Sequence, residues 1–394
     1  MKILYCAIDQ RVPGTTGGSV HVEAVAVGLA ALGHDVHVLT GSGDGPFPAH
    51  GVHWMPMTSP LGARQLRWAR SRDVTRIARE IEPDVVIERY YNFGGEGIVA
   101  AGAVGAVGVL EVNAPVIDYP GSRKALLDKA MIVEPMRRWR ERLCARADLV
   151  VTPSAAILPA GIDRAKVIEI EWGADTDRFR PGAAGPLRYA RPSGTLAVFA
   201  GAFRSWHGAE HLVRAVRTLR DEGRTEISAV LIGDGPELSR ARAAAEGTAG
   251  ITFTGAVPHA EMPAQLAAAD IGVAPFDTAA HGPLALGFYW SPLKMFEYMS
   301  SGLPVVAPSV DRIPALIAHD VEGLLYPPSD PGALAGSLIR LTDGPLRARM
   351  GAAARARAVS QFSWAAHCRA LDRVISEALS RKTASRRHAH PARH

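Results

Sequence analysis

The sequence predicts an α/β protein built from two doubly wound domains, each with a parallel β-sheet covered by helices. Two observations support this fold class. Short apolar runs of strand length alternate with helical patterns of roughly 10 to 15 residues, which is typical of βαβ units. This alternation stops at a Gly/Pro-rich segment near the middle of the 394-residue chain and then starts again. The sequence therefore predicts two Rossmann-like domains separated by a linker.

The first predicted domain covers residues 1–181. Its apolar runs predict strands at 2–8, 35–41, 83–91, 107–113 and 147–154, and its amphipathic patterns predict helices at 18–33, 64–81 and 134–147. The Gly/Pro-rich stretch that follows, 182–193, has no periodicity and predicts a linker.

The second predicted domain covers residues 194–361. Its apolar runs predict strands at 195–203, 228–235, 251–257, 271–276, 303–309 and 323–327. An amphipathic stretch at 362–381 predicts a C-terminal helix that packs back on the first domain. The basic, unpatterned end of the chain, 382–394, predicts a disordered tail. Two such domains would face a central cleft at the carboxyl ends of their strands, where ligands usually bind.

Composition narrows the class of protein. Apolar residues make up 47% of the chain and charged residues 21%, which is ordinary for a soluble globular protein. The net charge of +5 fits anionic ligands or an anionic membrane surface without proving either. The arginine-rich helices at 64–79 and 137–146 are interpreted as solvated faces, with contact to a membrane surface or an acidic acceptor as the alternative.

The ends of the chain and its cysteines indicate a compartment. No apolar run reaches the ~18 residues of a transmembrane helix, and the N-terminal segment lacks the features of a signal peptide. Cys6, Cys144 and Cys368 lie far apart, which suggests reduced thiols and neither disulfides nor a zinc site. We therefore expect a cytoplasmic protein with no nucleic-acid partner and no metal.

The segment YWSPLKMFEYMSSGLPVV combines a helix start with a cation in the first turn. Ser291 is a good N-cap, and Pro292 suits the first helical position. Lys294 is unfavourable so close to the positive end of the helix dipole unless an anion binds there. The amides of Leu293 and Lys294, with the Lys294 ammonium, would then form a phosphate site. The alternative is a solvated Lys294 paired with Glu297, three residues later.

A second candidate phosphate contact lies in the loop GAFRSWHG, where a strand passes into a helix. Arg204 could grip a phosphate with two N–H groups and His207 could add a donor, although a solvated loop arginine is the alternative. The turn Gly233, Asp234 and Gly235 follows another strand of the same domain. It is weak evidence alone, because Gly-Asp-Gly is a common turn sequence.

In the first domain, Gly17 and Gly18 open a helix after the first strand, where their amides could approach a ligand closely. The spacing GxGxxG is absent from both domains, which disfavours NAD binding. His21 lies one turn into that helix, and it is either a functional residue or a buried histidine.

Polar side chains also follow two strands of the first domain: Glu88 and Arg89, with Asn92 just beyond them, and Glu111 and Asn113. We expect these side chains to project toward the cleft. A structural ion pair between Glu88 and Arg89 is the alternative. The sequence contains no GxSxG, HExxH, P-loop or CxxC pattern.

In this order, these segments resemble the GT-B retaining glycosyltransferases, particularly glycosyltransferase family 4. The resemblance covers almost the whole chain, from the GG loop through EWGADTDRFRP, GAFRSWHG, LIGDGPE and FTGAVPHAEMPAQLAAADIGVAPF to SPLKMFEYMSSGLPVVAP. It implies a GT-B fold whose C-terminal helix returns to the first domain. It also implies that the second domain binds the nucleotide sugar and the first binds the acceptor. The acceptor-side candidates are then Glu88, Arg89, Asn92, Glu111 and Asn113.

The resemblance implies roles for individual residues. Arg204, Lys294 and His21 are the catalytic candidates, and the two cations would stabilise the departing diphosphate in place of a metal. Glu297 would bind the ribose hydroxyls. The donor-binding candidates are Gly17, Gly18, His207, Gly233, Asp234, Gly235, Val257, Pro258, Tyr289, Ser291, Pro292, Leu293 and Glu297.

Two residues depart from the family pattern. Tyr289 stands where the family has the first glutamate of an E-x7-E pair. That glutamate usually contacts the donor sugar, so the transferred sugar stays open. His207 stands where lysine is usual, which makes the phosphate contact depend on histidine protonation or hydrogen bonding.

The resemblance implies a metal-independent retaining glycosyltransferase that needs no cofactor and uses a UDP- or GDP-sugar. The expected acceptor is a small molecule of natural-product, thiol or cyclitol type. A lipid-linked or polysaccharide acceptor, with peripheral membrane contact, is the first alternative. A nucleotide-sugar 2-epimerase and a sugar-binding protein without catalysis are less favoured.

Overall fold

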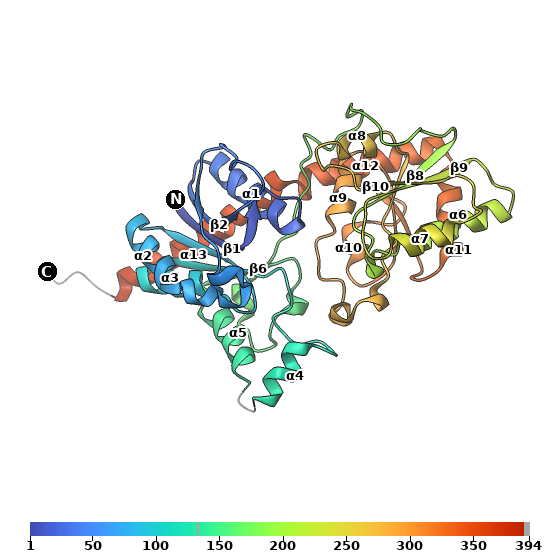
Figure 1. Cartoon of the computed structure of the whole chain (residues 1–394). Helices are drawn as coiled ribbons and strands as arrows, with labels where there is room; N and C mark the ends of the chain where they lie inside the picture. The colour runs from blue at the N-terminus through green and yellow to red at the C-terminus, as the bar shows by residue number, and fades with distance from the viewer. Residues whose placement is uncertain (132–133, 390–394) are drawn as a thin grey trace. The chain divides into compact units, whose positions relative to one another are not determined.

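The computed structural model describes residues 1–131 and 134–389 and divides into two compact units (Figure 1). The first unit comprises Met1–Trp172 together with the C-terminal segment from Trp364 onward, and the second comprises Gly173–Ser363. The chain therefore leaves the first unit after Trp172, before the expected limit at residue 181, and returns to it after Ser363.

Within the described residues, the first unit has a seven-stranded parallel sheet of order β3-β2-β1-β4-β5-β6-β7. Because β1 pairs with β2 on one side and β4 on the other, the chain winds outward from β1 in both directions, as expected for a doubly wound sheet. The strands are β1 Lys2–Val12, β2 Asp35–Ser42, β3 Val52–Pro56, β4 Val85–Arg89, β5 Val107–Glu111, β6 Leu149–Thr152 and β7 Val167–Glu169.

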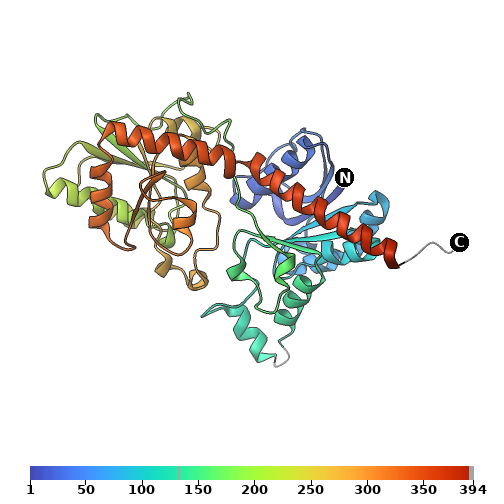
Figure 2. The ribbon, with the colours of Figure 1, turned by 180° about the vertical axis from the view of Figure 1, so that it is seen from behind.

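Helices cover both faces of this sheet. The cores place α1 and α13 on one face, where Leu29 and Leu371 are buried, and α2 and α3 on the other, where Val74 and Ala100 are buried. Figure 2 shows α13 running along the first unit. The α-helices are α1 Gly17–Ala31, α2 Ser71–Ile81, α3 Glu96–Val104, α4 Arg123–Ala130, α5 Pro135–Arg146 and α13 Trp364–Ala389, and the 3-10 helices are η1 Pro60–Gly62, η2 Arg64–Arg70, η3 Ala155–Ile157 and η4 Arg164–Lys166.

Two expectations for the helices of the first unit are corrected by the structure. The helix expected over 64–81 is α-helical only from Ser71 onward and begins as η2. α13 continues to Ala389, so the expected disorder is wrong for residues 382–389, whereas 390–394 lie outside the described residues. No glycine or proline interrupts the sequence of α13. Lys382 Nζ also anchors the helix, donating to Asp148 Oδ2 at 2.6 Å.

The second unit has, in the part of the chain that is described, a six-stranded parallel sheet of order β10-β9-β8-β11-β12-β13. The strands are β8 Thr195–Ala200, β9 Ile227–Ile232, β10 Ile251–Gly255, β11 Ile271–Val273, β12 Val305–Pro308 and β13 Gly323–Tyr326. The order reverses between β8 and β11, and doubly wound sheets bind ligands beyond the carboxyl ends of the strands at such a point.

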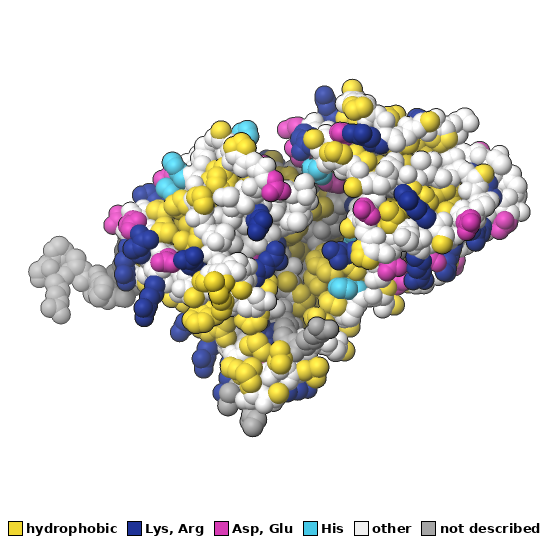
Figure 3. All heavy atoms as spheres, viewed as in Figure 1, with side chains coloured by type: hydrophobic (Ala, Val, Ile, Leu, Met, Phe, Trp, Pro, Cys, Tyr) yellow, Lys and Arg dark blue, Asp and Glu magenta, His cyan; other side chains and the backbone are white. Residues whose placement is uncertain are grey.

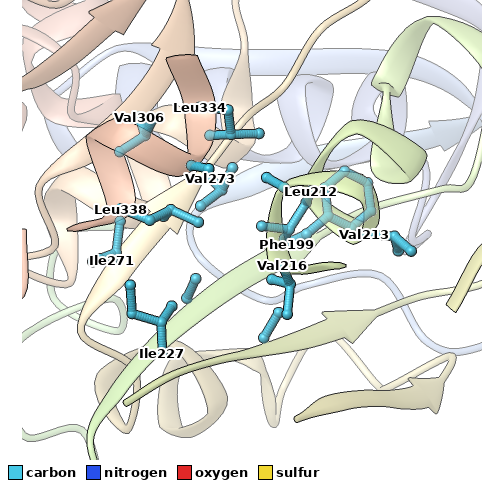
Figure 4. Close-up of a cluster of buried hydrophobic side chains, with 14 of the residues drawn as sticks. Phe199, Leu212, Val213, Val216, Ile227, Ile271, Val273, Val306, Leu334 and Leu338 are labelled. Atoms are coloured by element: carbon cyan, nitrogen blue, oxygen red, sulfur yellow. The ribbon is translucent and has the colours of Figure 1, made fainter. Parts of the chain in front are cut away.

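Hydrophobic side chains join the helices of the second unit to this sheet. Figure 4 shows Phe199 of β8 beside Leu212 and Val216 of α6, and these residues belong to one buried cluster. The α-helices are α6 Ala209–Asp221, α7 Leu238–Ala245, α8 Met262–Ala267, α9 Leu293–Ser300, α10 Ile313–Leu316, α11 Pro331–Arg340 and α12 Gly344–Gln361, and the 3-10 helices are η5 Ser205–His207, η6 Thr278–Ala280 and η7 Gly282–Leu286. Among the helices of the described chain, none combines the length and apolar character needed to cross a bilayer.

The segment 182–193, expected to be a linker, packs against α8 in the second unit. The Tyr189 hydroxyl donates to the backbone oxygen of Gln265 at 2.8 Å, and Arg188 NH2 lies 2.6 Å from Glu261 Oε1. Tyr189 is also buried. These contacts fix an irregular backbone in place, so the high Gly/Pro content indicated the absence of helix and strand but not a free linker.

Candidate functional site

Two glycine-rich loops meet at the carboxyl end of β8 in the second unit. Phe203 N donates to the backbone oxygen of Asp234 at 2.9 Å, which ties the loop after β8 to the turn after β9. A Cβ on Gly235 would lie 2.7 Å from Phe203 N, and a Cβ on Gly233 would overlap the backbone of Gly201. These glycines are therefore needed because the two backbones approach more closely than a side chain allows.

Lys294 enters this junction from the first turn of α9. Its Nζ is enclosed, although part of the residue remains accessible, and it has no hydrogen-bond partner among the described residues. The ammonium lies 4.4 Å from the centroid of the Phe199 ring and 5.4 Å from that of Phe276. A Cβ on Gly201 would lie 2.9 Å from Nζ, so a glycine at this position leaves room for the ammonium.

The surroundings of Lys294 disfavour its charge in the free protein. Burial lowers the pKa of Lys294 to about 7, and the Glu297 carboxylate opposes part of this shift. The proposed pairing of Lys294 with Glu297 is nevertheless wrong as a hydrogen-bonded contact, because Glu297 Oε1 lies 3.2 Å from His259 Nε2 and Lys294 Nζ is unpartnered among the described residues. An anion entering the junction would supply the missing partner.

His207 lies beside the ammonium, buried at the end of η5. Its Nδ1 lies against the backbone oxygen of Ala202, which can only accept, so Nδ1 carries the proton of the neutral ring. Burial, with additional contributions from Lys294 and Arg204, lowers the pKa of His207 to about 3. The neutral ring would therefore present an unprotonated Nε2, and donation from Nε2 to a phosphate requires uptake of a proton.

Arg204 is exposed at the start of η5. Its charge is close enough to His207 and His281 to contribute to the lowered pKa of each. The structure therefore brings Arg204, His207 and Lys294 near one another at one strand end, and their joint contact with a phosphate stays a prediction.

The start of α9 differs from the prediction. The N-cap residue is Pro292, without a side-chain cap, and the helix begins at Leu293, so Ser291 is not the cap. Leu293 N donates to Ser291 O at 3.0 Å, so this amide already has a partner. Lys294 N belongs to the first turn, where amides have no partner within the helix. Of the two amides expected to bind phosphate, only that of Lys294 lacks a partner within the helix, and its contact with phosphate stays a prediction.

The remaining donor-binding candidates lie around this junction with different exposures. Val257 is half-buried and Pro258 is exposed in the loop after β10, and the neighbouring His259 contacts Glu297. Tyr289 is buried, 3% exposed, with its ring centroid 4.6 Å from that of Trp290. The position where the family has a glutamate is therefore a buried tyrosine packed against Trp290.

An aromatic cluster beside Arg204 was not anticipated. The rings of Trp206 and Trp290 stack with centroids 4.4 Å apart, and the His281 ring lies 5.6 Å from Trp290. Both tryptophans flank the phosphate candidates in sequence, in SWHG and YWSPLK. That adjacency was the available signal, and contact between the two loops could not be read from it.

In the first unit, Glu88 does not project from the sheet as expected. It is completely buried and accepts hydrogen bonds from Gly95 N at 2.5 Å and Ile98 N at 2.8 Å, which anchors the start of α3. Burial, together with the charge of Glu96, raises the pKa of Glu88 to about 8. The suggested ion pair with Arg89 is also absent among the described contacts, because neighbouring strand residues point to opposite faces.

Arg67 is a buried arginine that the sequence did not reveal. Its guanidinium lies 2.5 Å from both Asp9 Oδ1 and Glu96 Oε1, and 3.9 Å from Glu88 Oε1. Arg140 of α5 is likewise buried and lies 3.1 Å from Asp118. The interpretation of both arginine-rich helices as solvated faces is therefore wrong at these two residues.

Glu111 is the centre of a second polar cluster. Its carboxylate accepts from the Tyr5 hydroxyl at 2.6 Å and lies 3.3 Å from Arg89 NH1. Asn113 Nδ2 also donates to Glu111, and Asn113 Oδ1 accepts from Trp172 Nε1 at 3.0 Å. Arg89, Glu111 and Asn113 therefore do meet at one end of the sheet.

His21 is enclosed in this second cluster. Its Nε2 lies 3.3 Å from Glu111 Oε1, and its ring centroid is 4.3 Å from that of Trp172 and 5.5 Å from that of His367. Burial, then the charge of Arg89, lowers the pKa of His21 well below its usual value. The neutral, fully buried ring supports the burial alternative for His21 more directly than a catalytic role.

The other candidates of the first unit lie at the same sheet end. α1 begins at Gly17, and a Cβ on Gly18 would overlap the Gln10 side chain and lie 3.3 Å from Arg89 NH2. Asn92 accepts from the Tyr90 hydroxyl at 2.9 Å.

Comparison with known families matches each half of the chain. Residues 15–178 match the model described as Glycosyltransferase Family 4, and residues 194–343 match the model described as Glycosyl transferases group 1.

Two relatives illustrate the range of sequence similarity. The MMP alpha-(1->4)-mannosyltransferase of Mycolicibacterium hassiacum is 27% identical over 423 aligned positions, which cover 93% of this chain and 96% of the relative. The D-inositol 3-phosphate glycosyltransferase of Streptomyces avermitilis is 33% identical over 219 residues, which cover 51% of this chain and 45% of the relative. The chain thus matches less than half the length of the latter.

Solved structures show the same fold at low sequence identity. A glycosyltransferase from Rickettsia africae superposes with a TM-score of 0.73 at 17% identity, covering 96% of this chain and 98% of that chain. Anabaena HepE in complex with UDP gives a TM-score of 0.70 at 18% identity, covering 96% of this chain and 100% of that chain. With both halves matched by family models and both sheets matched in fold, the chain belongs to the GT-B glycosyltransferases of group 1.

Proposed function

We propose that this protein transfers a sugar from a nucleoside diphosphate sugar, UDP- or GDP-linked, to an acceptor, with retention of the anomeric configuration. The observation that carries this proposal is the enclosed Lys294 ammonium, which lacks a hydrogen-bond partner among the described residues at the carboxyl end of β8. Burying a charge without a partner is unfavourable. A diphosphate bound against Lys294 and Arg204 would remove that penalty.

The same cations would assist the reaction. As the bond from the sugar C1 to the diphosphate oxygen breaks, negative charge grows on the leaving group, and Lys294 and Arg204 would stabilise it. The acceptor oxygen forms its bond to C1 on the same face, and its proton passes to the departing phosphate oxygen. This route requires no carboxylate base. A route without a base agrees with the position of Glu88, because its carboxylate already accepts hydrogen bonds from two amides at the start of α3.

We further propose that transfer requires no metal. Two cationic side chains and the first-turn amide of Lys294 supply positive charge at one place. His207 adds a third cation if it takes up a proton on binding the diphosphate. Glu297, 18% exposed and already oriented by His259, would receive the ribose hydroxyls.

For the acceptor we propose a small polyol of cyclitol or natural-product type, bound by the first unit. Two relatives named for small cyclitol acceptors support this class: the D-inositol 3-phosphate glycosyltransferase of Streptomyces avermitilis and the 2-deoxystreptamine glucosyltransferase of Streptomyces kanamyceticus. In this chain, Arg89, Glu111 and Asn113 at the end of the first sheet offer polar groups suited to hydroxyls.

A lipid-linked acceptor is the second candidate, and one observation favours it. Figure 3 shows apolar side chains gathered around α4 with Lys and Arg nearby, and Leu126 and Leu127 there are 65% and 62% exposed. Exposed leucines beside basic residues suit an anionic membrane surface. Sedimentation with anionic vesicles, comparing wild type with Leu126→Ser/Leu127→Ser, would separate this candidate from a soluble acceptor.

The test of the function is incubation with UDP- and GDP-sugars, with and without cyclitol acceptors, followed by NMR of the products. Transfer with the donor's anomeric configuration is expected. A product epimerised at C2 of the donor sugar would indicate an epimerase. Binding that raises the melting temperature without any turnover, across the donors and acceptors, would indicate a sugar-binding protein.

A further inference from the structure

Two histidines and an aspartate gather at the edge of the first unit's sheet. Asp35 and His37 lie on β2, and His53 lies on β3, directly opposite His37 in the parallel register. Alternate residues of a strand share a face, so Asp35 and His37 project to the same side, and neighbouring strands lie about 4.8 Å apart. The two imidazoles therefore stack, with centroids 4.5 Å apart and planes 17° apart.

A ring nitrogen of each histidine lies beside the same oxygen of Asp35. His37 Nε2 lies 3.0 Å and His53 Nε2 lies 3.3 Å from the same oxygen, Asp35 Oδ1. Ligands bound tetrahedrally at 2.0–2.1 Å from a zinc ion are separated by about 3.3 Å. One ligand atom from each of the three residues falls within 4.8 Å of the others. The spacing therefore suits a shared cation.

Hydrogen bonding does not account for this convergence. His37 Nε2 is buried and has no hydrogen-bond partner in the described structure, although Asp35 Oδ1 is 3.0 Å away. The 3.0 Å contact therefore lacks the angle of a hydrogen bond, and the ring nitrogen is left without a partner that a bound cation could supply. Two stacked imidazolium rings would repel each other, whereas two neutral imidazoles can share a cation.

The electrostatics and access also suit a metal. One carboxylate and two imidazole nitrogens form a mixed N/O set, which suits zinc and neighbouring transition metals more than Mg²⁺ or Ca²⁺. The side chains of His53 and Asp35 are 63% and 45% exposed, which leaves an entry path and a position for water, while His37 is 18% exposed. We propose that Asp35, His37 and His53 form a zinc site that fastens the edge strand β3 to β2.

This site is distinct from the proposed transfer chemistry. Asp35 and His37 occupy the start of β2, whereas the polar clusters around Glu111 and Gly18 lie at the carboxyl ends of strands in the same sheet. A zinc ion at the strand starts would stabilise the first unit without touching the reacting groups. Stability would rise with the logarithm of zinc concentration above the dissociation constant.

The test measures zinc binding to the full chain, expressed without a histidine tag, stripped with EDTA and dialysed. Isothermal titration and elemental analysis would count zinc per chain in wild type, His53→Gln and Asp35→Asn. Both substituted residues are exposed, so the variants should fold, and circular dichroism of the zinc-free proteins checks this. The matched control is His50→Gln, which removes an exposed histidine from the preceding loop.

We expect His53→Gln and Asp35→Asn each to bind one zinc fewer than wild type and to lose the zinc-dependent rise in melting temperature. His50→Gln should keep both. The sequence RRHAHPARH near the C-terminus can bind zinc itself, but it is present in every variant. Equal zinc content in wild type and His53→Gln, no zinc in wild type at 100 μM, or the same loss in His50→Gln would overturn the proposal.

Discussion

His259 Nε2 lies 3.2 Å from Glu297 Oε1, and this contact separates two residues of α9 that sequence spacing would pair. Lys294 and Glu297 are three residues apart, yet Glu297 is held by the loop after β10 and the Lys294 ammonium points to the end of β8. The two side chains can therefore serve different parts of one ligand. Kinetics of the single variants should show this division.

Lys294→Ala should lower kcat/KM by roughly one to two orders of magnitude. A charge-assisted hydrogen bond is worth roughly 1.5–3 kcal/mol, and about 1.36 kcal/mol corresponds to a tenfold change in rate. Because charge on the leaving group grows in the transition state, much of the loss should appear in kcat. Steady-state kinetics with saturating acceptor measures this, and transfer at the wild-type rate would contradict the assigned role.

Glu297→Gln should mainly raise the KM for the donor and weaken nucleotide binding, with a smaller effect on kcat. The reason is that a ribose contact is made equally in the ground and transition states. His259→Gln is the matched control, since it removes the partner of Glu297 but leaves the carboxylate. If both variants merely lower the melting temperature equally and leave the donor KM unchanged, the pair is structural.

The stability of the free protein should rise with pH through Lys294. Burial places its folded pKa near 7, below its usual value of 10.5, so the unfolded chain binds more protons between these values. The penalty is complete below about pH 7 and disappears as the pH approaches 10.5. Lys294→Met removes this dependence while keeping the apolar stem. The difference in melting temperature between Lys294→Met and wild type should thus be largest at pH 6 and shrink by pH 9.

Binding of UDP or GDP should have the opposite dependence on pH. A bound diphosphate favours the charged form of Lys294, so affinity should be constant below about pH 7 and fall above it. Isothermal titration in buffers of different ionisation enthalpy should also detect proton uptake by Lys294 or His207. Lys294→Met provides the baseline for titration of the nucleotide's own phosphate, and identical pH profiles for both proteins would refute the linkage.

Transfer should survive EDTA with little loss of rate, because cationic side chains and a helix-end amide would replace a metal at the diphosphate. The measurement is initial rate before and after chelation, with Mg²⁺ and Mn²⁺ added back separately. A large loss restored by either ion would mean that the diphosphate site needs a metal. A lower melting temperature after chelation, with the transfer rate unchanged, would instead reflect removal of zinc from the proposed site on β2 and β3.

The sequence predicted correctly mostly those elements whose conformation depends on their own local residues. The strands of the second sheet and the loop carrying Arg204 follow from local patterns of apolar runs and glycines. By contrast, Ser291 is not the N-cap because Pro292 has the non-helical dihedral angles φ −81° and ψ 81°, which residue type alone does not reveal. A residue type that is favourable at the N-cap therefore does not by itself predict where the helix begins.

Buried charges were the least predictable feature. Arg67 is one of several arginines in its segment, and residue type does not show which of them is buried. Its contacts with the carboxylates of Asp9 and Glu96, which are distant in the sequence, distinguish it from the others. Glu88 was expected at an open strand end because its strand is followed by polar residues. Its actual role depends on the two amides at the start of α3, which no local pattern identifies.

The return of α13 to the first unit has a consequence for biosynthesis. Leu371, Val374 and Ile375 belong to the same buried core as β1 and α1, although they are synthesised only after the whole second unit. The contiguous segment Gly173–Ser363 can complete its core earlier, since domains tend to fold as units during synthesis. The nascent N-terminal sheet therefore keeps part of one apolar face uncovered until α13 has been synthesised, and premature termination before α13 would release an aggregation-prone product.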